Sequence, residues 1–575
     1  MNNAESDRVF SSSSGHRVMV IGWDSATWKL LKPWVNDGEL PTLRALLQNG
    51  SAGTLLSTIP PLSPAAWTSF VTGQNPDRHG VFDHLYRTDA SYGSVPINAR
   101  RRMSTPIWSL LRQQNKHVGV INVPVTFPPE PVQGYMISGM YTPSEEADYT
   151  YPSTLKAELE QAIGGYSVFG RRSKRDLDLS LDGLFEAMEF RFRATDYLLS
   201  AKPWDLFVLV FQETDIVQHK FWKYMDPTHP DYVASAPAKY RSAILDIYRR
   251  TDDILARLLR HVDDDVFLIL MSDHGAGPLC KYFYLNTWLL REGFLRLKSD
   301  LATRLRWLVF RSGAFPTQLL DLASRLSPIL EDKAVALVKR EQHHTTGRKG
   351  LIQRLFLSNE DIDWSRTQAY ALGGNFPGIY LNVRGREPEG CVSPGKEYDA
   401  VRDAICQRLL ELRDPESSQS VVRAVHLREE IYKGPYAERT PDVLFDMNDE
   451  YMAFSMHEFS SNKVLARSSW FSGTHKPDGI VVISGPGIRQ GVSLPSARIV
   501  DLMPTILYML GCPIPRGLDG NVLESAFYRS HILDNPPSFS DADVNVEADG
   551  EAELDFSPEE VKIVEGRLRD LGYMG

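Results

Sequence analysis

The sequence has few cysteines, no long hydrophobic run and no excess of basic residues. Its four cysteines lie far apart without a CxxC pair, which gives no disulfide framework and fits a reducing compartment. No uninterrupted apolar stretch reaches the roughly 18 residues that a membrane-spanning helix requires. The 73 Asp and Glu residues outnumber the 63 Lys and Arg residues, and the resulting net charge of −10 argues against a nucleic-acid polymer as the main partner.

The first residues also lack the apolar segment of a signal peptide. Residues 1–16 are polar and serine-rich, and we expect them to form a disordered lead-in. Together with the cysteine usage, this predicts a cytoplasmic protein without a membrane span. The remaining composition, 42% hydrophobic and 24% charged over 575 residues, is that of a globular protein. A chain of this length indicates several domains, or one large α/β domain with insertions.

An apolar run at residues 266–271 predicts a buried strand, and the metal-capable residues Asp273 and His274 follow it. Continuous apolar runs are typical of parallel strands that are buried on both faces. Open α/β sheets place their active sites beyond the carboxyl ends of such strands. Asp273 and His274 are therefore candidate ligands, although an Asp followed by a Gly after a strand also makes an ordinary turn.

Two further predicted strands end in residues of the same kind. Residues 17–23 form a short β-branched run that precedes Asp24, which is either a ligand or a helix cap. The predicted buried strand at 204–211, which is apolar apart from Asp205, is followed by Asp215 and His219. If that segment is helical, residues four apart lie on one helix face and can reach one cation.

Ser63 lies before Pro64 at the predicted start of a helix through residues 65–72. A serine in this place is commonly a helix cap. The alternative is chemical, because the free backbone N–H groups at a helix N-terminus favour a phosphoryl anion beside the hydroxyl.

Taken together, Asp24, Ser63 and residues 273–275 resemble the alkaline phosphatase superfamily. The nearest resemblance is to its type I phosphodiesterase and nucleotide pyrophosphatase branch, with the related predicted phosphohydrolases and phosphomutases, over most of residues 17–530. In that branch the nucleophilic Ser or Thr lies about ten residues before the Gly of a Val-Thr-Gly motif. Ser63 stands ten residues before Gly73 of Val-Thr-Gly, so the resemblance selects it as the nucleophile.

The resemblance also implies a two-metal centre. One ion would be held by Asp215, His219 and His475, the last in a Gly-Thr-His motif, and the other by Asp24, Asp273 and His274 with Ser63 beside it. Carboxylate and imidazole ligands without a thiolate favour Zn²⁺, with Mn²⁺ or Fe²⁺ as alternatives. His84 stands where the branch has an Asn that helps to hold a phosphate oxygen, and a histidine can donate the same hydrogen bond.

The expected function is therefore a two-metal phosphohydrolase that cleaves a small-molecule phosphate ester through a phosphoserine on Ser63. A phosphoryl transferase or phosphomutase with the same metal core is the alternative, because only exclusion of water separates the two. A non-catalytic metal-binding protein would require a missing ligand. The sequence does not favour a sulfatase, because residues 63–67 lack the (Cys/Ser)-x-Pro-x-Arg motif of that branch.

The predicted fold is α/β, with a mostly parallel, alkaline-phosphatase-like sheet flanked by helices and a large helical cap insertion. A basic cluster at Lys339, Arg340, His343 and His344 could face a substrate anion, but it is interpreted as a solvated face. The expected division is a metal-binding core at 17–275 and 447–530, a cap at 276–365 with helices at 286–295, 303–310 and 317–339, sheet-edge elements and the return from the cap at 366–446, and an acidic linker with a C-terminal helix at 531–575.

Overall fold

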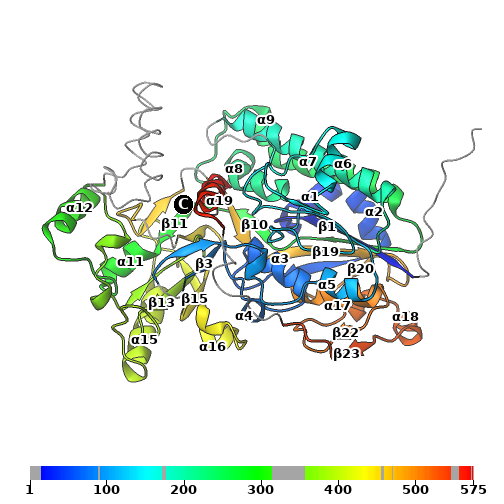
Figure 1. The fold of residues 1–575 in the computed structure, drawn as a ribbon. Helices are drawn as coiled ribbons and strands as arrows, with labels where there is room; N and C mark the ends of the chain where they lie inside the picture. Colours follow the sequence, from blue (N-terminus) through cyan, green and yellow to red (C-terminus); the bar gives the residue numbers. More distant parts are fainter. Residues whose placement is uncertain are drawn as a thin grey trace, which may run out of the picture.

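A computed structural model describes most of the chain (Figure 1). The described residues are 15–88, 91–170, 176–313, 356–454, 459–468, 471–545, 556–571 and 573. Outside them lie residues 1–14 of the expected lead-in, the expected helix at 317–339, the basic cluster from Lys339 to His344, and residues 546–555 of the expected linker.

A ten-stranded sheet forms the centre of the larger lobe, in the order β20-β2-β19-β9-β1-β8-β5-β6-β7, with β21 paired to β2. Its middle strands are parallel: β9 (Val266–Met271), β1 (Arg17–Trp23), β8 (Leu206–Phe211), β5 (Val118–Ile121) and β6 (Gly134–Ile137). β19 (Asp478–Ser484) runs antiparallel to both β9 and β2 (Ser51–Leu56). Short strands complete the edges: β7 (Thr150–Tyr151), β20 (Val492–Ser493) and β21 (Ala497–Arg498). The predicted α/β fold class is confirmed.

Helices cover both faces of this sheet (Figure 1). Along β1, Met19 and Ile21 pack into one core cluster and Val18 and Val20 into another, because successive strand residues point to opposite faces. The first cluster is closed by α1 (Trp28–Asp37), α2 (Pro41–Asn49), α7 (Leu177–Ala201), α8 (Glu213–Met225) and α10 (Ala243–Leu258). The second is closed by α3 (Ser63–Thr72), α5 (Ile107–Gln113) and α17 (Leu502–Met509).

A second, smaller lobe is built from the inserted residues and carries its own hydrophobic core. Its helices are α11 (Leu285–Glu292), α12 (Leu301–Ser312), α15 (Lys396–Glu411) and α16 (Arg428–Ile431). One sheet of its described part has the order β16 (Tyr451–Phe454), β11 (Lys281–Tyr284) and β17 (Leu465–Arg467). Another has the order β12 (Ala369–Tyr370), β13 (Gly378–Leu381), β15 (Val443–Met447) and β14 (Val422–Leu427).

The strands of residues 366–446 were expected at the edge of the main sheet, and that expectation is wrong. β13 pairs with β12 and β15, and β15 pairs with β14, all antiparallel and all within the second lobe. The apolar faces of these strands pack against α11 and α15 in the lobe's own core, so the main sheet gains no strand from them. The insertion is therefore a mixed α/β lobe, with sheets as well as helices.

The C-terminal part of the chain returns to both lobes. The predicted final helix is confirmed as α19 (Pro558–Leu571), which lies where the lobes meet (Figure 1). The described part of the expected linker has regular structure, because α18 (Arg529–Asp534) precedes β23 (Phe539–Ser540), and β23 pairs with β22 (Ile514–Pro515).

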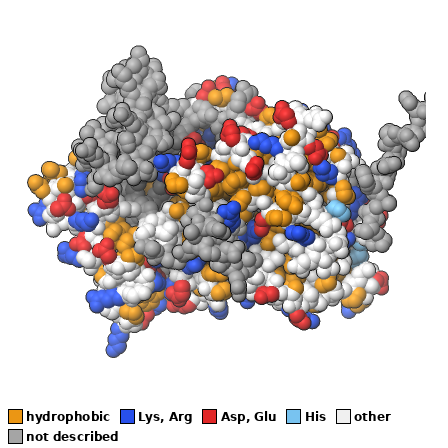
Figure 2. Space-filling view, in the orientation of Figure 1, with side chains coloured by type: hydrophobic (Ala, Val, Ile, Leu, Met, Phe, Trp, Pro, Cys, Tyr) orange, Lys and Arg blue, Asp and Glu red, His pale blue; other side chains and the backbone are white. Residues whose placement is uncertain are grey.

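The distribution of charge on the surface concerns nucleic-acid partners, and the length and hydrophobicity of the helices concern membrane partners. On the face shown in Figure 2, acidic and basic side chains are intermixed, and neither sign dominates its described part. Within the described ranges, no helix is both long and apolar enough to cross a membrane. The cytoplasmic location stays a prediction.

Candidate metal centre

Three neighbouring strands bring the acidic candidates to one edge of the central sheet. β1 pairs in parallel with both β8 and β9, and Trp23 lies opposite Phe211, so the strands end close together. Asp24 follows β1 directly, Asp273 comes shortly after β9, and Asp215 lies in the first turn of α8, which begins beyond β8. All three carboxylates are buried.

A short antiparallel pair adds the last histidine to this edge. β10 (Gly275–Pro278) pairs with β18 (Gly473–Lys476), and Ala276 lies opposite His475. His475 thereby comes beside His274, the residue before β10, and their rings stack with centroids 3.9 Å apart. Two segments that are far apart in the sequence thus supply neighbouring imidazoles.

Asp215, His219 and His475 form the first cluster of donor atoms. His219 Nε2 lies 3.2 Å from Asp215 Oδ2 and 3.0 Å from His475 Nε2, and His475 Nε2 lies 3.4 Å from Asp215 Oδ1. His219 Nδ1 donates to the carbonyl of Gly473 at 2.8 Å, so in the neutral ring Nε2 carries the lone pair. A ring that is fixed in this way by a backbone carbonyl is typical of metal-binding histidines.

Asp24, Asp273 and His274 form the second cluster, with Ser63 beside it. His274 Nε2 lies 3.3 Å from Asp273 Oδ2, 3.9 Å from Asp24 Oδ1 and 3.1 Å from Ser63 Oγ. His274 Nδ1 donates to the carbonyl of Gly275 at 3.1 Å, which again leaves Nε2 facing the cluster. Ser63 is the first residue of α3 and does not cap it, since Leu62 occupies the N-cap position.

The two clusters join at His274. One ligand atom from each of Asp215, His274 and His475 lies within 4.8 Å of the others, and the same holds for Asp24, Asp273 and His274. The structure thus gathers Ser63 and all of the predicted ligands in one buried place. Their division between two ions stays a prediction.

The electrostatics of the cluster fit bound cations. Burial, followed by the carboxylates of Asp273 and Asp215, raises the pKa of Asp24 well above its ordinary value. Burial and Asp215 raise the pKa of Asp273 to about 7. Burial would also raise the pKa of Asp215, but His219 and His475 hold it well below its usual range. The raised pKa values of Asp24 and Asp273 reflect burial together with repulsion from neighbouring carboxylates.

Carboxylate oxygens without a hydrogen-bond partner also indicate a cation site. Asp24 Oδ1, Asp215 Oδ1 and Asp273 Oδ2 are buried without a hydrogen-bond partner, which is costly unless a cation meets them. Within the part of the chain that the structure describes, the ion pairs of these carboxylates are all with the cluster's own histidines. The donor set therefore fits divalent metal ions.

Sequence reasoning missed the residues that hold these ligands in place. The indole N–H of Trp67 donates to Asp24 Oδ2 at 3.1 Å, and the backbone N–H of Ser25 donates to Asp273 Oδ1 at 3.2 Å. Trp67 lies in the fully buried helix α3, one turn after Ser63. That i to i+4 spacing was the one signal that could have linked Trp67 to the site.

His84 lies at the side of the cluster. It is fully buried, Nδ1 contacts the hydroxyl of Tyr141 at 2.8 Å, and Nε2 has no hydrogen-bond partner. Burial, with a smaller effect of His475, lowers the pKa of His84 to about 3. Its imidazole is therefore neutral at ordinary pH and can donate or accept a hydrogen bond without adding charge.

Tyr573, close to the end of the sequence, also reaches the cluster and was missed. Its hydroxyl donates to Asp215 Oδ2, and its ring stacks on His84 with centroids 4.5 Å apart. Burial and the neighbouring Asp215 raise the pKa of Tyr573 well above its ordinary value, so the hydroxyl stays protonated. A lone tyrosine after a surface-type helix carries no sequence signal for such a place.

The chain is similar in sequence to a protein family and in fold to several solved structures. The family model for type I phosphodiesterase / nucleotide pyrophosphatase matches residues 18–478. The chain is similar to the crystal structure of phosphonoacetate hydrolase from Sinorhizobium meliloti 1021, with 16% identity and a TM-score of 0.51 over 86% of this chain and 95% of that one. Murine ectonucleotide pyrophosphatase / phosphodiesterase 5 is 14% identical, with a TM-score of 0.48 over 89% of this chain and 100% of that one. No curated protein sequence matches the chain.

Proposed function

The chain belongs to the type I phosphodiesterase / nucleotide pyrophosphatase family, and from this membership we propose how its buried centre acts. Members of this family are metal-dependent hydrolases of phosphate esters, so the protein is an enzyme of that class. We propose that its substrate is a small-molecule phosphate ester and that Ser63 is the nucleophile.

One observation carries the proposal for Ser63. Its hydroxyl lies 3.1 Å from His274 Nε2, beside the cluster of Asp24, Asp273 and His274. Ser63 also begins the ten-residue helix α3, whose first backbone N–H groups favour an anion. The hydroxyl therefore lies next to the candidate metal ligands and at the N-terminus of α3, which would stabilise a phosphoryl group.

The residues that would hold two ions are those of the two clusters. Asp215, His219 and His475 would hold one, and Asp24, Asp273 and His274 the other. When bound, the cations would lower the pKa of the serine hydroxyl and of a water molecule, and would neutralise charge on the phosphoryl oxygens. We propose Zn²⁺ for this set of carboxylates and imidazoles, with Mn²⁺ and Fe²⁺ as alternatives.

The chain's own groups carry out two displacements. Ser63 Oγ attacks phosphorus, the bond to the leaving oxygen breaks, and that oxygen leaves as an alcohol with the serine proton. A water molecule then attacks the phosphoserine, which releases phosphate or a phosphomonoester and restores the Ser63 hydroxyl. Trp67 and the Ser25 N–H hold Asp24 and Asp273 in place throughout.

Ser63→Ala tests the proposal. We expect turnover on p-nitrophenyl phosphate and bis-p-nitrophenyl phosphate to fall by roughly 10³-fold or more while the bound metal content stays unchanged. Ser57→Ala is the matched control, because the Ser57 hydroxyl has no hydrogen-bond partner and lies outside the cluster. Retained turnover in Ser63→Ala would refute the nucleophile, and the ratio of the two substrates separates a diesterase from a monoesterase.

Phosphoryl transfer is the second candidate, and burial favours it. Ser63, Asp24 and His274 are each 0% exposed, and a site that excludes water favours transfer to another hydroxyl. Adding an acceptor alcohol to the assay and counting phosphorylated alcohol against free phosphate decides between the two reactions.

A further inference from the structure

Tyr573, which follows helix α19, makes a hydrogen bond to the candidate metal ligand Asp215. We propose that Tyr573 is a positioning residue, whose hydroxyl holds the Asp215 carboxylate in the orientation that binds a divalent cation. This inference rests on the proposed function, because it takes Asp215 as a metal ligand.

The two oxygens of Asp215 have different contacts. Oδ2 accepts a hydrogen bond from the Tyr573 hydroxyl and lies 3.2 Å from His219 Nε2, whereas Oδ1 has no hydrogen-bond partner and lies 3.4 Å from His475 Nε2. A carboxylate that is held by a donor on one oxygen presents the other in a fixed direction, as the outer partners of metal ligands generally do. Tyr573 therefore does for Asp215 what the Gly473 carbonyl does for His219.

The position of Tyr573 is fixed from several sides. Its ring stacks on His84 at an angle of 15°, and meets the ring of His219 edge-on with centroids 5.5 Å apart. Its backbone lies against Gly374 of the second lobe, where a Cβ atom would come within 2.3 Å of the Tyr573 carbonyl oxygen. The aromatic ring thus packs against histidines of the candidate metal centre, while the backbone of Tyr573 lies against the second lobe.

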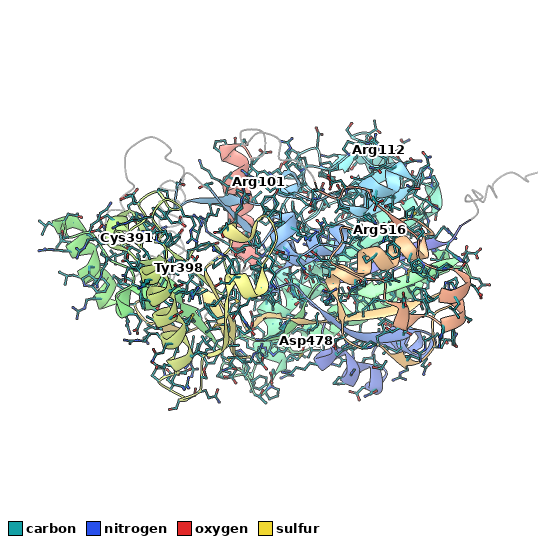
Figure 3. All side chains as sticks on the ribbon, turned by 90° about the horizontal axis from the view of Figure 1, so that it is seen from below. Arg101, Arg112, Cys391, Tyr398, Asp478 and Arg516 are labelled. Atoms are coloured by element: carbon teal, nitrogen blue, oxygen red, sulfur yellow. The ribbon has the colours of Figure 1, made fainter. Side chains whose placement is uncertain are left out.

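Helix α19, which leads to Tyr573, is anchored as part of the core. Val564, Leu568 and Leu571 are buried, and they pack into the cluster that also contains the strands of the main sheet. Arg567 donates to the carbonyls of Thr142 and Pro143. Figure 3 shows this helix, in red, between the two lobes. Helix α19 is therefore packed as part of the protein core beside the candidate metal centre.

A competing interpretation is that Tyr573 occupies the place of the substrate and inhibits the enzyme. The two interpretations differ in what removal of one hydroxyl does. A positioning residue is needed for tight metal binding, so its loss weakens the centre. An inhibitory side chain is not needed, so its loss leaves metal binding intact and raises turnover.

Tyr573→Phe in the full chain decides between them, because it keeps the ring and removes the hydrogen bond to Asp215. Zinc affinity is measured by competition with a chromophoric chelator, which needs no turnover. We expect the affinity of one zinc site to fall about 10–100-fold, and excess zinc to restore turnover. Tyr141→Phe is the matched control, because its hydroxyl contacts His84 and not Asp215, and its zinc affinity should equal that of the wild type.

Each other outcome overturns the inference. Unchanged zinc affinity in Tyr573→Phe would remove the positioning role, and so would higher turnover at every zinc concentration. The failure of the proposed function is separate: retained turnover in Ser63→Ala refutes the nucleophile without affecting the zinc titration. A wild-type protein that binds no zinc, manganese or iron would refute the metal centre itself, and the role of Tyr573 with it.

Discussion

A single added methyl group at Gly22 tests the packing that places Asp24 beside Ser63. Gly22 lies in β1 at the middle of the sheet, between Val210 and Met271 on the neighbouring strands. A Cβ atom there would lie 2.4 Å from Cη2 of Trp67 and 3.1 Å from Cγ2 of Val210. The indole of Trp67 is fully buried and donates to Asp24, so it cannot move aside without disturbing the site.

The structure sets the size of the effect of Gly22→Ala. Overpacking of a close-packed core costs about 1–3 kcal/mol, and a weakened hydrogen bond to the Asp24 carboxylate adds about 1 kcal/mol. We therefore expect the free energy of unfolding to fall by about 2–4 kcal/mol. Because α3 carries both Trp67 and Ser63, we also expect a shift of about 1 Å at the nucleophile and a loss of about 10²-fold in kcat.

Urea denaturation followed by circular dichroism gives the stability, and kcat is measured on p-nitrophenyl phosphate at saturating zinc. Gly566→Ala is the control, because it lies inside α19 and a Cβ atom there meets nothing within 4 Å. That substitution should raise stability by about 0.5–1 kcal/mol through the better helix propensity of alanine. A Gly22→Ala protein with wild-type stability and wild-type kcat would show that Trp67 can move freely, and would refute the reasoning.

Three further expectations concern charge. Burial, with a smaller effect of Arg102, lowers the pKa of His79 from 6.5 to about 3, so the fold loses stability as pH falls from 6.5. At pH 5 this costs about 2 kcal/mol, and His79→Asn should reduce the difference in urea midpoint between pH 8 and pH 5 accordingly. Arg191→Met should cost about 3–5 kcal/mol in urea denaturation at pH 7, because it strands the carboxylate of Glu213, its fully buried partner at 2.7 Å; replacing Glu213 by Leu as well should recover most of that loss. Removal of the metal by a chelator should lower the melting temperature measured by scanning fluorimetry, and the decrease should be smaller at pH 5 than at pH 8. At pH 5 Asp273, whose pKa is raised to about 7, is protonated, so it no longer repels the carboxylate of Asp215. An equal effect of chelation at both pH values would contradict this last account.

Much of the central fold was predictable because its signals are local. Uninterrupted apolar runs marked β8 and β9, and both are buried along their whole length. Helix signals marked residues 65–72, which lie inside α3, and the final helix α19. The resemblance to the family is confirmed by the match over residues 18–478. These patterns arise from backbone periodicity and side-chain burial within one segment, so a single sequence contains them.

The second lobe was predicted less well for the opposite reason. The strands β12 to β15 were recognised in part, but they were assigned to the edge of the main sheet. The alternation of a short strand shows which face is buried, and it does not show which strand will be its neighbour. Their pairing with one another follows from the lobe's own core, which exists only after the chain has folded.

The sequence by itself indicated most of the candidate ligands, because Asp24, Asp273 and the pair Asp215 and His219 follow predicted strands, and parallel strands end at one edge. Ser63 and His475 were selected through the resemblance to the family. Only the tertiary structure decided how these residues meet. The pairing of β10 with β18 stacks His475 on His274, and α3 turns Trp67 towards Asp24. Helix α19 likewise carries Tyr573 to Asp215. Such contacts depend on the packing of segments that are distant in the chain, and no local pattern specifies that packing.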